Sequence, residues 1–324
     1  MGFYDADLLI IGAGPAGLCA AQYGARANLK AVVLEQMAPG GQVLNIEVLE
    51  NYPGNIAHGD FPPRSGFEFS QDLHKQAEEF GAQFIMEGAA GIVKEEEIFT
   101  VTLSSGKTLR ALSLIFAAGA EQRKLGVPGE VELYGRGVSY CAACDGPFFK
   151  GKRILAVGGG DAACDEAQFL SRLAGKLILI HRKSMFRAQK ALAERTLANP
   201  NIEVRFNTRL LEIMGDTKVT SVKLDGPATG SAKTAVYEEP MDGVFIFAGS
   251  VPQTALLKEL GVKLDETGYV VTDQNMASSV PGLFAAGDVR SCPFRQVVVA
   301  AGEGAVAAHS AAGYIDSLKG VRYV

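Results

Sequence analysis

The chain has 324 residues, of which 48% are hydrophobic and 21% are charged, and its formal net charge is −5. This composition is typical of a globular protein of about two domains and excludes a disordered or low-complexity chain. The negative net charge gives no indication of a nucleic-acid partner. The longest apolar runs, such as 112–118, are far shorter than the ~20 residues of a membrane-spanning helix. We therefore expect a soluble, cytoplasmic protein without a targeting segment. We expect it to bind neither a membrane nor a nucleic acid.

The first motif follows a strand-like apolar run at residues 8–11. It reads Gly12-Ala-Gly14-Pro-Ala-Gly17, and it precedes a helical stretch to about residue 28 and a second strand at 31–34. In a dinucleotide-binding turn, the first glycine makes the turn and the second lets the backbone approach a pyrophosphate. The third position must be small so that the helix packs on the strand. The helix N-terminus then faces the phosphates.

The same pattern occurs a second time in the middle of the chain. A strand at 154–157 leads into Gly158-Gly-Gly160-Asp-Ala-Ala163, a helix to about 173 and a strand at 177–180. In both copies 23 residues separate the first glycine from the residue after the second strand (12 to 35 and 158 to 181). The repeated spacing predicts an α/β fold with two Rossmann-like, three-layer dinucleotide-binding domains.

The residue after the second strand distinguishes the two sites. Glu35 provides an acid that would bind a ribose hydroxyl, which suits FAD or NAD. The second copy has His181, Arg182 and Lys183 there, with Arg187 one turn later. A cationic cluster favours a 2′-phosphate, so this site is predicted to prefer NADPH. The alternative is a solvated basic face without a ligand.

Two similar buried strands, at 114–119 and 244–249, flank the second motif. We interpret them as crossovers between domains, with an NADPH-binding domain at 120–248 inserted into a FAD-binding domain at 1–119 and 249–324. The returning chain contains a strand that ends near Asp288. Ligands of open α/β sheets bind at the carboxyl ends of strands, so Asp288 is a candidate site residue.

Cys141 and Cys144 form the only CxxC motif of the chain, and Asp145 follows directly. Three interpretations are open: a zinc site, a pair of inert thiols, or a redox disulfide in which the second sulfur resolves a mixed disulfide made by the first. Asp145 is either a general acid/base for a departing thiolate or a turn former. Of the other cysteines, Cys19 and Cys164 are predicted to be small core residues, and Cys292 has no assigned role.

The cysteine pair lies in the predicted NADPH-binding domain. The nicotinamide and the dithiol would both have to reach the flavin, although one inserted domain carries both of them. We therefore expect that domain to rotate between two orientations during turnover.

Several motifs in order give the chain a resemblance to the low-molecular-weight thioredoxin reductases of bacteria. They are GAGPAG at 12–17, GGQV at 40–43, ENYPG at 50–54, LGVPGE at 125–130, GRGVSYCAACDG at 135–146, GGGDAA at 158–163, HRKSMFRA at 181–188, GLFAAGDVR at 282–290 and RQVVVAAGEG at 295–304. The resemblance covers nearly the whole chain. Glutathione-reductase-type proteins differ, because their redox pair lies near the N-terminal flavin motif.

The resemblance implies roles for individual residues. FAD would be held by Gly12, Gly14, Gly17, Glu35, Gln36, Gly41, Gln42 and Asn51, with Asp288 at the ribityl chain and Arg295, Gln296 and Val297 near the isoalloxazine ring. NADPH would be bordered by Gly158, Gly160, Asp161, Ala162, Glu166 and His181, with Arg182, Lys183 and Arg187 at its 2′-phosphate. Cys144 would lie next to the flavin, Cys141 would exchange with thioredoxin, and Asp145 would be the acid.

The resemblance also implies an NADPH-dependent thioredoxin-disulfide reductase. Electrons would pass from NADPH to FAD, to the Cys141–Cys144 disulfide and then to thioredoxin, in a homodimer that contacts mainly through its FAD domains. Lys183 departs from the family, which commonly has arginine there, and the connection at 55–69 is longer than usual. Two rivals remain: a relative that reduces another dithiol partner, and a flavin-binding sensor without turnover.

Overall fold

The computed structural model describes residues 4–46, 49, 51–56, 63–227 and 234–321. Its internal contacts divide the chain into two compact units. Unit 1 comprises Met1–Glu121 and Val251–Val324, and unit 2 comprises Gln122–Ser250. The sequence-based boundaries were 119/120 and 248/249. The nucleotide that each unit binds stays a prediction here.

Unit 1 is built on a parallel sheet with the strand order β3-β2-β1-β6-β17. The strands are β1 (Ala6–Ile11), β2 (Ala31–Leu34), β3 (Gln83–Ile85), β6 (Thr108–Phe116) and β17 (Leu283–Ala285). β1 and β2 are buried along their whole length, as expected for parallel strands covered on both faces. The antiparallel strands β5 (Ile98–Leu103) and β4 (Ala89–Glu95) extend the sheet from the first half of β6.

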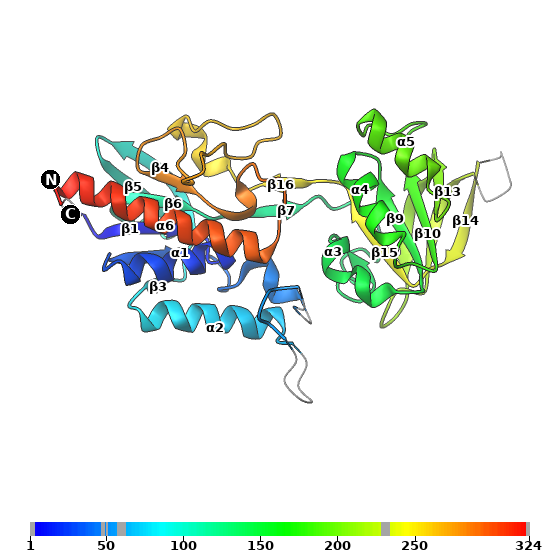
Figure 1. The fold of residues 1–324 in the computed structure, drawn as a ribbon, viewed down its shortest axis with the longest axis horizontal. Helices are drawn as coiled ribbons and strands as arrows, with labels where there is room; N and C mark the ends of the chain where they lie inside the picture. The colour runs from blue at the N-terminus through cyan, green and yellow to red at the C-terminus, as the bar shows by residue number, and fades with distance from the viewer. Residues whose placement is uncertain (1–3, 47–48, 50, 57–62, 228–233, 322–324) are drawn as a thin grey trace. The chain divides into compact units, whose positions relative to one another are not determined.

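Helices cover one face of this sheet (Figure 1). They are α1 (Pro15–Arg26), α2 (Gly66–Glu79) and α6 (Val297–Lys319), and α1 packs against both of the others. Leu8 and Ile10 point toward this helical layer, whereas Leu9 and Ile11 belong to the core on the opposite face, with β4, β5 and the 3₁₀ helix η3 (Ala255–Leu260). The alternation along β1 therefore builds two cores, one on each side of the sheet.

The start of α2 lies inside the connection that was expected to be long. Residues 57–62 are outside the described residues. Ser65 caps α2: its hydroxyl accepts the Glu68 N–H, and the Glu68 carboxylate accepts the Ser65 N–H. This capping box explains why the helix begins at Gly66, so the last residues of the 55–69 connection are helical.

Unit 2 is a second three-layer unit. Its parallel sheet has the order β11-β10-β9-β15-β8. The strands are β8 (Val138–Ser139), β9 (Arg153–Gly158), β10 (Lys176–His181), β11 (Ile202–Phe206) and β15 (Gly243–Phe247). The helices of this unit are α3 (Ala142–Asp145), α4 (Asp161–Leu170) and α5 (Lys190–Ala198).

The two faces of the unit 2 sheet again carry separate cores. Ile154 and Ala156 pack with residues of α3 and α4, while Leu155 packs with the antiparallel sheet β12-β13-β14. That sheet consists of β12 (Arg209–Met214), β13 (Ser221–Pro227) and β14 (Thr234–Pro240). The predicted fold class, α/β with two three-layer dinucleotide-binding folds, is confirmed.

Two short strands join the units. β7 (Ala120–Gln122) pairs with β16 (Ser250–Pro252) in a two-stranded sheet. The expected crossover segments at 114–119 and 244–249 mostly belong to β6 and β15, which are inner strands of their sheets, so the residues that follow them make the connection. Within the part of the chain that the structure describes, no helix has the length and apolarity to cross a membrane, and this includes the 23-residue α6.

Candidate functional site

The glycine-rich turn of unit 1 lies between β1 and α1. Gly12 has φ +98°, and a Cβ there would be 2.5 Å from the carbonyl oxygen of Ala117. A Cβ at Gly17 would be 1.8 Å from the Gly12 oxygen. No atom lies within 4 Å of the Cβ position at Gly14. The fold itself therefore requires the first and third glycines, whereas the second leaves open space at the N-terminus of α1, where a pyrophosphate fits.

Glu35, directly after β2, is held against this turn. Its Oε2 accepts the Ala13 N–H at 2.8 Å and its Oε1 accepts the Met37 N–H at 2.9 Å. Each carboxylate oxygen keeps a further lone pair for a ribose hydroxyl. Gln36 follows and packs against Gly88, whose Cβ position is 3.2 Å from Gln36 Oε1.

Two further segments of unit 1 that were predicted to bind FAD lie close to other residues with the same predicted role. The Gly40 N–H donates to the Ala13 oxygen at 2.7 Å, and a Cβ at Gly41 would be 3.3 Å from the Gly14 Cα. The Gln42 amide, in the 3₁₀ helix η1 (Gly41–Asn45), donates to the Ala120 carbonyl. The structure thus brings GGQV beside the glycine-rich turn.

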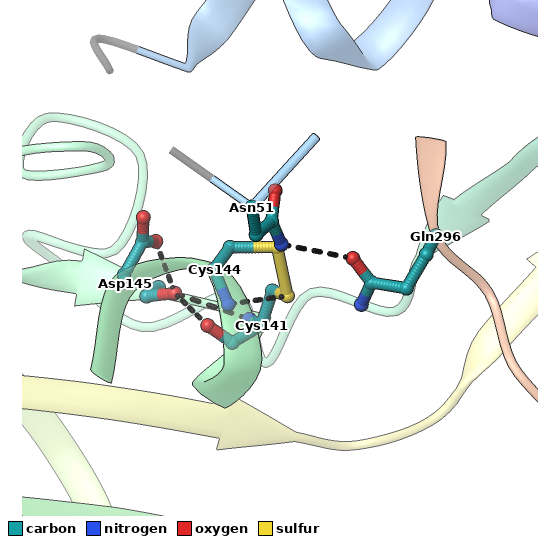
Figure 2. Close-up of a disulfide and its surroundings, with 6 residues drawn as sticks. Asn51, Cys141, Cys144, Asp145 and Gln296 are labelled. Carbon is teal, nitrogen blue, oxygen red and sulfur yellow. Dashed lines mark hydrogen bonds between the residues drawn. A yellow bond between two sulfur atoms is a disulfide. The ribbon is translucent and has the colours of Figure 1, made fainter. Parts of the chain in front are cut away.

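The Asn51 amide donates to Gln296 Oε1 at 3.1 Å, shown by the dashed line between them in Figure 2. Gln296 is the N-cap residue of α6, and Val297 is the first residue of that helix. This bond links ENYPG to RQV, although 245 residues separate the two in sequence.

Arg295 and Asp288 are polar groups of unit 1 whose protein contacts leave capacity for a ligand. The Arg295 guanidinium lies 4.1 Å from the centre of the Tyr269 ring, and its Nε is buried without a hydrogen-bond partner in the described part of the chain. Asp288 lies in the short 3₁₀ helix η4 (Gly287–Val289). Burial raises the pKa of Asp288, the nearby Arg295 opposes this, and Glu303 adds to it. An orphaned buried donor and a desolvated acid fit a flavin with a polyol chain.

Glu303 and Arg290 form an ion pair in unit 1 that was not predicted from the sequence. The Glu303 carboxylate, inside α6, accepts the Gly287 N–H at 2.8 Å and pairs with the Arg290 guanidinium. Arg290 Nε donates to Thr272 at 2.9 Å. The available signal was an acid inside an otherwise apolar helix, VVVAAGEGAVAA, because a carboxylate in such a position requires a partner.

The glycine-rich turn of unit 2 lies between β9 and α4. A Cβ at Gly158 would be 2.5 Å from the Ala163 Cβ, whereas no atom lies within 4 Å of that position at Gly160. The open space at Gly160 therefore corresponds to the open space at Gly14 in unit 1. Asp161 and Ala162, at the start of α4, are exposed, and Glu166 is half-buried with a pKa raised by burial and by Asp165.

The basic segment after β10 is bonded to this turn. The Arg187 N–H donates to the Gly159 oxygen at 2.7 Å, and the Gln189 N–H donates to Asp161 Oδ1 at 2.7 Å. Arg182, Lys183 and Arg187 are exposed at this edge of the sheet. They are therefore free to bind a phosphate beside the turn.

His181 differs from these three cations. Its side chain packs over Gly159, where a Cβ would be 2.2 Å from Nδ1, and the residue is 6% exposed. Burial lowers the pKa of His181, and Arg187, Arg182 and Lys183 lower it further. The neutral imidazole supports the turn, so the positive charge at this edge comes from the three exposed cations.

Cys141 and Cys144 form a disulfide at the short helix α3, with 5.3 Å between their Cα atoms (Figure 2). Cys141 is the N-cap residue, and its sulfur accepts the Cys144 N–H at 3.1 Å. The disulfide favours the redox interpretation over a zinc site or inert thiols. Cys19 and Cys164 are buried free thiols, as predicted, and burial raises the pKa of Cys19 to about 11.

Asp145 lies beside the disulfide and ends α3 (Figure 2). Burial raises its pKa, and a 2.5 Å hydrogen bond from the Ser139 hydroxyl opposes this. Asp145 follows Cys144 directly in the chain, and a carboxyl group with a raised pKa can give and take protons. Ser139 was not singled out from the sequence, because its contact depends on how β8 lies beside α3.

Tyr140 connects the cysteine pair to the LGVPGE segment. Its hydroxyl donates to Glu130 Oε1 at 2.8 Å, and the fully buried Glu130 carboxylate also accepts the N–H groups of Leu125 and Gly126. Burial and Glu130 raise the pKa of Tyr140. This network fixes the residue that precedes Cys141.

The comparisons with known proteins agree with this geometry. The family model for pyridine nucleotide-disulphide oxidoreductases matches residues 6–304. The chain is 52% identical to thioredoxin reductase of Treponema pallidum (strain Nichols) over 315 residues, which are 97% of this chain and 99% of the relative.

Two solved structures extend this comparison. Thioredoxin reductase from Streptococcus pyogenes MGAS5005 is similar with a TM-score of 0.87 and 40% identity, covering 96% of this chain and 98% of that chain. Lactococcus lactis thioredoxin reductase in the FR conformation has a TM-score of 0.65 and 37% identity, covering 97% of this chain and 100% of that chain.

Fold, disulfide and family match define the class: a pyridine nucleotide-disulphide oxidoreductase. Such enzymes pass electrons between a nicotinamide nucleotide and a protein disulfide. Within this class, the chain belongs to the thioredoxin reductase family. The family is NADPH-dependent and uses FAD and NADPH as cofactors.

Proposed function

We propose that this chain reduces the disulfide of thioredoxin with electrons from NADPH. The observation that carries the proposal is the Cys141–Cys144 disulfide, with Asp145 beside it, in the unit that also holds the basic segment at 182–187. The relatives named thioredoxin reductase support thioredoxin as the acceptor. When bound, NADPH and FAD supply the two electrons that reduce the protein disulfide.

We assign the FAD site to unit 1. The pyrophosphate occupies the open space at Gly14, with Gly12 and Gly17 shaping the turn, and Glu35 binds a ribose hydroxyl. The remaining residues of this proposed site are Gln36, Gly41, Gln42, Asn51, Asp288, Arg295, Gln296 and Val297. The orphaned Arg295 Nε and the desolvated Asp288 support their assignment.

We assign the NADPH site to unit 2. The pyrophosphate lies at Gly160 and the start of α4, and the 2′-phosphate is bound by the exposed cations Arg182, Lys183 and Arg187. The same proposed site includes Gly158, Asp161, Ala162 and Glu166, and the His181 ring packed against Gly159 supports the turn. Phosphate binding by three cations explains a preference for NADPH over NADH.

Thiol exchange follows from the roles of the cysteine pair. The Cys141 thiolate attacks one thioredoxin sulfur, so the thioredoxin disulfide breaks, a mixed disulfide forms, and Asp145 gives its proton to the leaving thiolate. Cys144 then attacks the Cys141 sulfur and passes its own proton to Asp145. The mixed disulfide breaks, and the thioredoxin sulfur that Cys141 had attacked leaves and takes that proton. The chain's dithiol becomes a disulfide, while the thioredoxin disulfide becomes a dithiol.

The proposal includes rotation of unit 2 between two orientations during turnover. The dithiol and the NADPH site lie on this one unit, while the residues assigned to FAD lie on the other. Only the two short strands β7 and β16 carry the chain between units. A double cross-link that holds one orientation is expected to stop steady turnover while leaving FAD bound, and full turnover of the cross-linked enzyme would contradict rotation.

We further propose a homodimer in a reducing, cytoplasmic setting. An exposed aromatic pair on unit 1, Tyr23 and Phe80, lies around the Arg26 guanidinium at 5.8 and 5.1 Å and provides apolar surface for a second copy. The half-buried free Cys292 fits a compartment in which thiols stay reduced.

The test compares wild type with Cys144→Ser under anaerobic conditions. Both proteins should be yellow, and NADPH should bleach the absorbance of both, because hydride uptake does not need the dithiol. Only wild type should then reduce thioredoxin, measured by insulin reduction. Thioredoxin reduction by Cys144→Ser would contradict the proposal.

Two other outcomes would select the rivals. Yellow protein that NADPH does not bleach would indicate a sensor or another electron donor. Normal bleaching with reduction of a glutaredoxin-like or peroxiredoxin-type protein, and none of thioredoxin, would indicate a different acceptor.

A further inference from the structure

Ser139 lies between the redox pair and its acid. It is the last residue of β8, is 2% exposed, and is held in the sheet opposite Phe245 of β15. Its Oγ is 2.5 Å from Asp145 Oδ2, 3.1 Å from the Cys141 backbone nitrogen and 3.3 Å from the Cys141 carbonyl oxygen. One hydroxyl thus contacts both the carboxyl group and the backbone of the exchanging cysteine.

A hydroxyl has one proton and two lone pairs, so it can serve all three contacts at once only when Asp145 is protonated and itself donates. One lone pair accepts the Cys141 N–H. When Asp145 is ionised, the hydroxyl proton points to Oδ2, because a carboxylate is a stronger acceptor than a carbonyl. When Asp145 is protonated, the second lone pair accepts the carboxyl O–H, and the hydroxyl proton turns to the Cys141 carbonyl. Only the hydroxyl rotates between the two arrangements.

We propose that Ser139 is a positioning residue for dithiol exchange, holding the Asp145 carboxyl group beside the cysteine pair both before and after it gives up its proton. The inference rests on the acid role proposed for Asp145. In this role, the Ser139 hydroxyl keeps the Asp145 carboxyl group in one place during the proton transfers. Without Ser139, the buried carboxylate would lose its hydrogen bond, and ionisation of Asp145 would become less favourable.

Among the residues that the structure describes, few groups near Asp145 other than Ser139 could change the pH dependence of the cysteine pair. Burial raises the pKa of the Asp145 carboxyl group, and the Ser139 hydrogen bond opposes that rise. Burial, with the nearby Asp145 charge adding to it, raises the pKa of Tyr134 above its ordinary value of 10, so this phenol stays protonated at neutral pH. The helix α4 packs on α3 and carries Asp161, Asp165 and Glu166. Of these acids, Glu166 has a raised pKa of its own, so it is the one to check in a pH profile.

The test uses the holoenzyme with three substitutions. Ser139→Ala removes the hydroxyl, and Ser139→Thr keeps it. Ser171→Ala is the matched control, because Ser171 is also a buried serine of unit 2 with a hydroxyl bonded to a backbone carbonyl, that of Gln168 at 2.9 Å. Each protein is reduced with dithiothreitol, desalted and alkylated with iodoacetamide between pH 5 and 9. Peptide mass spectrometry separates Cys141 from Cys292.

We expect Ser139→Ala to move the acid inflection of Cys141 alkylation upward by about one pH unit, because Asp145 loses the bond that stabilises its charge. Thioredoxin reduction should fall about 10-fold near neutral pH. Ser139→Thr and Ser171→Ala should keep the wild-type profile. A uniform rate loss at every pH would show a merely structural role for Ser139 and overturn the proposal.

Alkylation keeps the inference separate from the proposed function, because it needs no thioredoxin. If thioredoxin is not the acceptor, the alkylation profile still tests Ser139. If Ser139→Ala loses FAD, Ser139→Gly replaces it. Ser139→Thr keeps the hydroxyl, so a folded Ser139→Thr protein whose alkylation profile is shifted would also overturn the proposal. This holds whether alanine or glycine is used to remove the hydroxyl. When Glu166→Gln is present in both proteins, Ser139→Ala should still shift the pH profile of Cys141 alkylation by the same amount.

Discussion

Glu303, inside the longest helix of unit 1, accepts a 2.8 Å hydrogen bond from the backbone N–H of Gly287, in the turn that carries Asp288. The same carboxylate pairs with Arg290, and the two side chains are only 10% and 14% exposed. Because this ion pair is buried, each charge depends on the other. The pair thus joins α6, whose first residues are assigned to the flavin, to the turn assigned to the ribityl chain.

Glu303→Ala is expected to destabilise unit 1 by about 3–5 kcal/mol, because it leaves the Arg290 guanidinium buried without its partner. Thermal unfolding followed by the fluorescence of released FAD measures the effect. The double variant Arg290→Met with Glu303→Gln should recover most of the loss, since it buries no unpaired charge and glutamine still accepts the Gly287 N–H. Wild-type unfolding of Glu303→Ala would show that the pair does not hold the turn.

Gly14→Val is expected to give a folded but colourless protein. Gly14 has an extended backbone, with φ −70° and ψ −178°, and no atom lies within 4 Å of its Cβ position. The fold therefore accepts the side chain, but the isopropyl group would fill the space assigned to the pyrophosphate. Circular dichroism reports folding, and the absorbance ratio at 450 and 280 nm reports FAD. As a control, Gly313→Ala in α6 also meets open space and should keep FAD. A yellow Gly14→Val protein would place the pyrophosphate elsewhere.

Lys183→Arg is expected to strengthen NADPH binding by about 3- to 10-fold, without changing NADH binding, because a guanidinium binds phosphate through two parallel hydrogen bonds. The ratio of the two dissociation constants, from anaerobic titration at fixed ionic strength, is the measurement. Lys223→Arg, an exposed lysine of unit 2 paired with Glu212, is the matched control. Equal effects on both nucleotides would mean that Lys183 does not contact the 2′-phosphate.

Asp145→Asn is expected to stabilise unit 2 at pH 8 while slowing thiol exchange. Since burial raises the pKa of Asp145 in the folded state, the folded state binds more protons than the unfolded state. Stability therefore falls as the pH rises from the ordinary value of about 4 through the folded-state pKa, and the full penalty applies above it. Asparagine has no such penalty, so its melting temperature should exceed that of wild type by about 2 °C at pH 8. The difference should disappear near pH 4, and a difference that grows in acid would contradict the raised pKa.

The sequence predicted those parts of the fold that local patterns determine. The strand expected at 31–34 is β2 as observed, and the run at 8–11 lies within β1. A glycine-rich turn between two apolar runs can be recognised in the sequence, because the helix that follows packs closely only if the third glycine position is small. Helix ends were less accurate: α1 ends at Arg26, two residues before Asn28 adopts a left-handed conformation with φ +60°.

What the sequence did not predict depends on contacts between distant segments. The antiparallel sheet of β12, β13 and β14 follows no local motif that was recognised. Ser139 meets Asp145 through the placement of a two-residue strand, and Glu303 meets Arg290 through a turn against a helix. His181 was expected directly after a strand at 177–180 but is the last residue of β10, and the spacing did not show that its ring packs over Gly159.

The pairing of β17 with β6 has a consequence for synthesis. Unit 2 is one continuous segment, so its two cores can form once Ser250 has emerged from the ribosome. Unit 1 must wait, because β17 and α6, which complete its central sheet and cover α1, are translated last. During that interval the apolar faces of β1 and α1 are open to solvent and to chaperones. A nascent chain that stalls before Val297 would present a finished nucleotide domain attached to an unfinished one.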